Sequence, residues 1–100
     1  MSEQCLLVLI APPGLEETLV DFLLAQEHFS GFSAQKVEGS PAHGRLTLAE
    51  QVTWRKRQVM FHVHAPREEV HRLVGQLKES FKGAGLHYWI TPLIEAGPIP

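Results

Sequence analysis

Two histidines in the stretch MFHVHA, Met60–Ala65, have a spacing that could hold a metal ion. Residues two apart on a strand point to the same face, so His62 and His64 would lie about 7 Å apart. Imidazole nitrogens bind Zn²⁺ at about 2 Å, and one ion could just bridge this pair. Because a tetrahedral metal needs about four ligands, a third would have to come from His87 or from a second copy of the chain. The alternative is a strand that carries neutral, hydrogen-bonded histidines on one face.

A second candidate is the basic run Arg55, Lys56 and Arg57, which follows Trp54. Such a run either ends a loop or strand in solvent or contacts an anionic ligand. The Trp ring could stack on that ligand, or it could anchor the loop to the body of the protein.

Composition limits the classes of function. The chain has 100 residues and a net charge of −2, so no overall positive field favours nucleic acid or an anionic membrane. Cys5 is the single cysteine, which rules out an intramolecular disulfide. The apolar run 5–11 is too short to span a membrane and ends in Pro-Pro-Gly. We therefore expect a cytoplasmic protein with neither a nucleic-acid partner nor a membrane-inserted segment.

Periodicity predicts four strands and two main helices. The strand at 57–65 alternates clearly: Val59, Phe61 and Val63 should face the core, and Met60 and the two histidines should face the other way. The predicted strands cover 5–11, 31–39, 57–65 and 86–94, and the predicted helices cover 15–29 and 66–82. Thr47 and Glu50 also have the spacing of a capping box, which predicts a short helical turn over 48–52.

This order predicts an α+β, ferredoxin-like βαββαβ fold, in which two helices cover one face of a four-stranded antiparallel sheet. We expect one domain over residues 1–97 and a loose C-terminal tail over 98–100. Since the first and last strands are apolar, the uncovered face should associate with other copies of the chain. RNA recognition would need aromatic residues in a pattern that strand 57–65 lacks. No catalytic constellation stands out, so we do not expect an enzyme.

Two longer motifs resemble a small bacterial family of PII-like proteins of unknown function. They are LTLAEQVTWRKRQVMFHV (46–63) and GAGLHYWITPLIEAG (83–97), and LIAPPGLEETLVDFLL (9–24) agrees with them more loosely. The resemblance implies a ferredoxin-like subunit that forms a homotrimer, as PII and CutA proteins do. It also implies a link to heavy-metal efflux, because members of this branch tend to be encoded beside efflux pumps.

PII proteins bind adenine nucleotides between subunits, so the resemblance also suggests a ligand site. The matching positions are Arg55, Lys56 and Arg57 for the phosphate-binding cations and Gly83 and Gly85 for a glycine-rich turn. Leu86 stands where nucleotide-binding relatives keep a lysine, and the C-terminal extension has no arginine. We therefore expect weak nucleotide binding or none, and a divalent transition metal is the other cofactor that we consider.

These observations predict a homotrimeric PII-like regulatory or sensing protein that acts on a partner such as an efflux component or regulator. Two alternatives remain. One is a protein that binds metal directly at His62, His64 and His87 without signalling. The other is a protein-interaction module with no small ligand.

Overall fold

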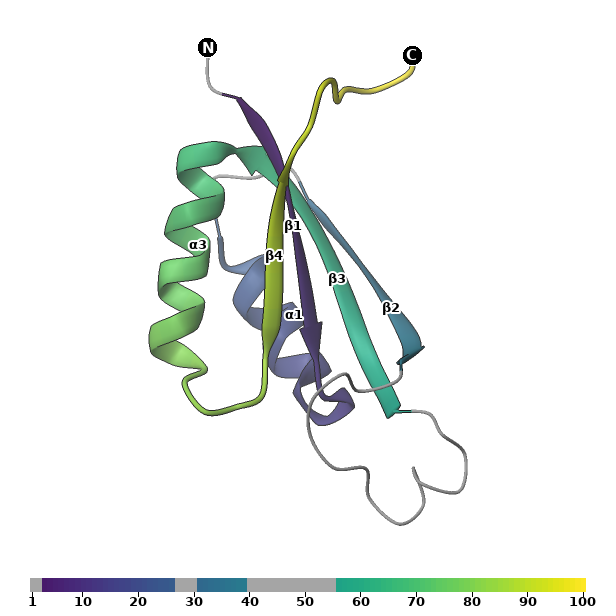
Figure 1. Ribbon diagram of the computed structural model, residues 1–100, viewed down its shortest axis with the longest axis vertical. Coiled ribbons are helices and arrows are strands. Elements are labelled where there is room, and N and C mark those ends of the chain that lie inside the picture. Colours follow the sequence, from purple (N-terminus) through teal and green to yellow (C-terminus); the bar gives the residue numbers. More distant parts are fainter. Residues whose placement is uncertain (1–2, 27–30, 40–55) are drawn as a thin grey trace.

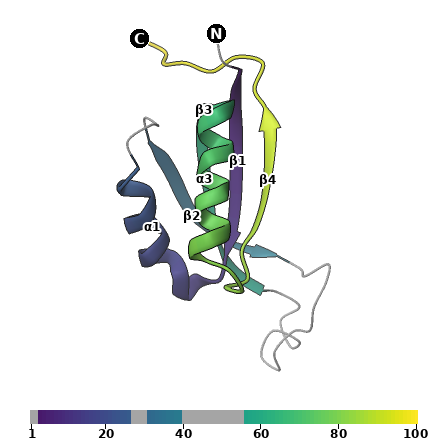
Figure 2. The same cartoon turned by 90° about the vertical axis from the view of Figure 1, so that its left-hand side faces the viewer.

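The computed structural model describes residues 3–26, 31–39 and 56–100. Its elements are β1 (Gln4–Ala11), the 3₁₀ turn η1 (Pro13–Leu15), α1 (Glu16–Leu24), β2 (Phe32–Gly39), β3 (Lys56–Pro66), α3 (Arg67–Ser80) and β4 (His87–Pro92). The sheet has the order β2-β3-β1-β4, and every neighbouring pair is antiparallel. Both helices lie on one face of this sheet (Figures 1 and 2). The predicted α+β, ferredoxin-like fold is confirmed.

The core lies between the sheet and the helices and follows the predicted alternation of β3. Val59, Phe61 and Val63 are fully buried, and they pack with alternate residues of β1 such as Leu7 and Leu9. The helices add Leu19 and Leu23 from α1, and Val70, Leu73, Val74 and Leu77 from α3. Among the described residues no polar or charged side chain is buried, so the core is held by apolar burial and close packing.

The face away from the helices is called here the open face. It carries Leu6, Val8 and Ile10 of β1, because these residues alternate with the core residues of that strand. Register places Val8 between His62 of β3 and Trp89 of β4. Val8 and Ile10 are buried even in the single subunit, whereas Trp89 is 47% exposed. The open face is therefore an apolar strip that its neighbours cover only in part.

Several boundaries differ from the sequence prediction. Helix α1 ends at Leu24, short of the predicted Phe29. Pro66 closes β3 rather than opening the helix, since its φ of −54° and ψ of 145° are extended backbone. Helix α3 then ends at Ser80, two residues before the predicted end, and Phe81 caps it. The predicted helical turn over 48–52 lies outside the described residues.

After β4 the chain forms no helix or strand through Pro100. The N–H of Leu93 still donates to the carbonyl of Gln4 at 2.9 Å, which continues the β1–β4 pairing by one residue. Beyond it Ile94 and Ile99 are fully exposed. Within the described ranges, no helix is long and apolar enough to cross a membrane.

Candidate functional site

The glycine-rich turn that joins α3 to β4 is the first candidate site. Gly83 and Gly85 adopt φ values of 78° and 85°, a left-handed conformation that other residues rarely take. One backbone hydrogen bond closes the turn, from the N–H of Ala84 to the carbonyl of Phe81 at 3.1 Å. Gly85 lies near Pro12, because a Cβ at this position would be 3.7 Å from the Pro12 Cγ. The turn is therefore held against the end of β1 while both glycines remain exposed.

Beside this turn is a hollow of about 450 Å³, called here the α3–β4 hollow. Its apolar lining comes from the core side of the sheet and the last turns of α3, namely Leu9, Val74, Leu77, Phe81 and Leu86. Lys78, Lys82 and Tyr88 give it a polar rim. The Lys78 ammonium lies 5.3 Å from the centre of the Tyr88 ring, a cation–π distance.

Neither lysine of the rim forms an ion pair with another described residue. Lys78 lies in the last turn of α3, where it offsets the negative end of the helix dipole, and Lys82 follows the helix by two residues. They also leave two positive charges beside an apolar cavity in a chain of net charge −2. The hollow can thus hold an apolar group that carries a negative charge.

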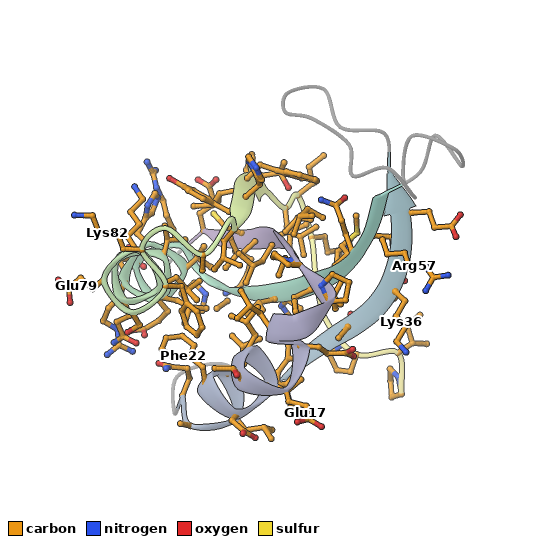
Figure 3. The ribbon with its side chains drawn as sticks, turned by 90° about the horizontal axis from the view of Figure 1, so that it is seen from below. Glu17, Phe22, Lys36, Arg57, Glu79 and Lys82 are labelled. Atoms are coloured by element: carbon orange, nitrogen blue, oxygen red, sulfur yellow. The ribbon has the colours of Figure 1, made fainter. Side chains whose placement is uncertain are left out.

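The basic residues predicted to bind a ligand lie elsewhere. Arg57 borders a second hollow of about 480 Å³ with Lys36, Glu38 and Pro13. Figure 3 shows Lys36 and Arg57 on the opposite side of the molecule from Lys82. The two hollows share no lining residue among those that the structure describes. Lys56 begins β3, and Arg55 lies outside the described residues.

The histidine pair occupies the open face as predicted. His62 and His64 border a hollow of about 300 Å³ together with Leu6 and Ser33. His87 is also on this face, but it pairs with Ile10 on β1, which pairs with Met60 on β3. His87 is therefore two strands away from β3 and offset by two residues from His62. These separations put the backbones of His87 and His62 about 12 Å apart. In the described part of the chain, no three His, Cys, Asp or Glu side chains gather closely enough to hold a metal ion.

One subunit therefore does not assemble the three predicted imidazoles around a single ion. The form of the metal site in which a second copy supplies the missing ligands stays a prediction.

Sequence reasoning missed the rim of the α3–β4 hollow. In the sequence alone, Lys78 and Lys82 are typical of the end of a helix and Tyr88 is typical of a packed strand, so each residue has a sufficient structural explanation by itself. Their convergence depends on the pairing of Tyr88 with Leu9, which places the start of β4 beside the last turns of α3. The spacing of two lysines four residues apart, next to a glycine-rich turn, was the one available signal.

Solved structures with the same architecture include PII-like proteins. A nitrogen regulatory PII-like protein, CPII from Thiomonas intermedia K12, bound to ADP, AMP and bicarbonate, superposes with a TM-score of 0.71. It is 18% identical, and the match covers 96% of each chain. A protein from Thermus thermophilus, described as PII-like and signalling, gives a TM-score of 0.67 at 15% identity. That match covers 92% of this chain and 88% of the other, and at these identities both likenesses establish the fold.

A crystal structure from Shewanella baltica OS155 is more similar in sequence. It is 28% identical, the match covers 100% of both chains, and the TM-score is 0.80. That protein is described as a DUF3240 family member. No curated protein matches the sequence. The model of the family "Protein of unknown function (DUF3240)" matches residues 1–100, and the chain therefore belongs to the DUF3240 family.

Proposed function

We propose that this protein is a cytoplasmic, non-enzymatic PII-like regulator that works as a homotrimer and changes its action on a protein partner when it binds a small ligand. The proposal includes the link to heavy-metal handling, with an efflux component or its regulator as the partner. PII-like architecture supports a regulatory or sensing role.

The observation that carries the proposal is the open face. Trp89 lies half-exposed beside the apolar strip of β1, and Leu6 and Met60 are also only partly covered. Exposed apolar surface of this kind is costly in water and is commonly buried between subunits. Three copies that turn their open faces toward one another would bury it.

The test of assembly is size-exclusion chromatography with light scattering. We expect a mass of three times the 11.2 kDa subunit at micromolar concentration. A monodisperse monomer or dimer would rule out the trimer. Calorimetry of the same sample with ATP, ADP and AMP then tests the ligand. Because Leu86 replaces the expected lysine, ATP should bind no more tightly than about 100 µM, and micromolar ATP binding would contradict this expectation of weak nucleotide binding.

The second candidate function is direct metal binding, which the placement of His62 and His64 on one face favours. In a trimer, three copies of this pair could supply the ligands that one chain lacks. The test is a titration with zinc, copper and nickel of the wild type and of His62→Ala/His64→Ala. We expect loss of binding in the variant, and lower wild-type affinity at about pH 5.5 than at pH 7.5, because imidazole must lose its proton to bind. Equal affinity in both proteins would place any metal elsewhere.

A further inference from the structure

Two apolar features lack a partner among the residues that the structure describes in the single subunit. The first is the α3–β4 hollow with its two lysines. The second is the segment Ile94–Pro100, called here the tail, which leaves the sheet without helix or strand. Its two isoleucines are 107% and 97% exposed, which is the exposure of an unfolded chain.

The tail and the hollow have complementary chemistry. The sequence IEAGPIP carries one acidic side chain, Glu95, and two branched apolar side chains, Ile94 directly before it and Ile99 four residues after it. The hollow offers an apolar lining, and Lys78 and Lys82 at its rim have no ion-pair partner among the described residues. An apolar segment with one negative charge is the kind of group that this hollow can hold. Pro98 also limits the freedom of the tail, which lowers the entropic cost of binding it in an extended form.

Ile94, the first residue of the tail, cannot enter the hollow of its own subunit. Tyr88, at the hollow, and Ile94 lie six residues apart along β4 and its continuation, a distance of about 20 Å. The hydrogen bond from Leu93 to Gln4 fixes the start of the tail beside the first residue of β1, whereas Tyr88 pairs with Leu9 near the last residue of that strand. Figure 1 shows the C-terminal segment leaving at the end of the molecule opposite the turn between α3 and β4. To bring Ile94 into its own hollow, the chain would have to detach β4 from β1.

We infer that the tail binds in the α3–β4 hollow of a neighbouring copy, with Ile94 and Ile99 against the apolar lining and Glu95 beside Lys78 and Lys82. The contact rests on the proposed self-association and adds to it an exchange of tails between subunits. It also places the tail next to Gly83 and Gly85, so that a ligand bound at this turn would contact the tail of a neighbouring subunit.

The experiment is site-specific photocrosslinking in the full-length protein. With Ile99 replaced by p-benzoylphenylalanine, illumination should give a covalent dimer of twice the 11.2 kDa subunit mass on a denaturing gel. Peptide mapping should place the crosslink within residues 74–88. The matched control has the same probe at Leu24, an exposed residue of α1, and should give no crosslink to this segment.

A charge reversal provides an independent measurement. Lys78→Glu should lower the yield of covalent dimer about threefold or more, since an exposed ion pair contributes a factor of this size. Glu95→Lys in the same chain should restore the yield, and circular dichroism should be equal in all variants.

Crosslinks that stay within one chain, or that map outside residues 74–88, would overturn the inference. A charge swap without rescue, or a small molecule found in the hollow in place of the tail, would do the same. Light scattering of the same samples separates this failure from that of the proposed function. A trimer without tail crosslinks refutes the tail exchange alone, whereas a monomer refutes both.

Discussion

Replacement of Trp89 by alanine should weaken the assembly of subunits without unfolding them. A tryptophan side chain has roughly 250 Å² of accessible surface, and 47% of Trp89 is still exposed in the single subunit. If a neighbouring copy covers that remainder, about 120 Å² of apolar area is buried on assembly. At about 25 cal/mol per Å² this contributes at most ~3 kcal/mol per subunit. The dissociation constant per contact should therefore rise by about 10- to 100-fold.

The assay is sedimentation velocity over a dilution series, with far-UV circular dichroism as the check on folding. Leu24→Ala is the matched control, because Leu24 is 68% exposed but lies on α1, on the helix-covered side. The control should dissociate at the same concentration as the wild type, and Trp89→Ala at a higher concentration. Identical dissociation of all three proteins would show that the open face is not the contact between subunits.

Further changes test the turn, the helix and the core. Gly75→Ala should stabilise the protein by about 1 kcal/mol, since a Cβ there meets nothing within 4 Å and alanine favours the helix; chemical denaturation measures it. Gly83→Ala should instead destabilise by about 1 kcal/mol, because the φ of 78° is unfavourable for alanine, and equal signs for the two variants would contradict the turn geometry. Phe61→Ala should lower the free energy of unfolding by about 3–5 kcal/mol in the same assay, since it leaves a cavity at a fully buried site beside Phe32. A loss below about 1 kcal/mol would contradict the burial of Phe61 in the core.

Much of the fold could be predicted because its signals are local. The alternation of Val59 with Met60 and the stripe that begins at Val70 follow directly from the periods of strand and helix. Charge at the helix ends is a local signal as well, because Glu68 and Glu69 lie in the first turn of α3 and Lys78 lies in its last turn. The first and last residues of each helix and strand are harder to predict, because a proline such as Pro66 fits the end of a strand as well as the start of a helix.

The candidate site was less predictable because it depends on register between distant segments. From the sequence, His87 could be placed on a strand, but its offset from His62 depends on which residues of β1 pair with each. The separation of Arg57 from Lys82 (Figure 3) likewise depends on the sheet order, because β1 lies between β3, which carries Arg57, and β4, which follows the turn after α3. Spacing along the chain holds no information on either distance.

The alternation of β3 also bears on how the chain avoids misfolding. A shift of one residue between β1 and β3 would turn His62 and His64 into the apolar core and expose Phe61 and Val63. Because no buried polar partner is present in the described core to satisfy an imidazole, that register is strongly disfavoured. Valine at both histidine positions would leave β3 apolar on each face, and the two registers would then compete during folding. Even with no ligand bound, the histidine pair therefore selects one alignment of the central strands.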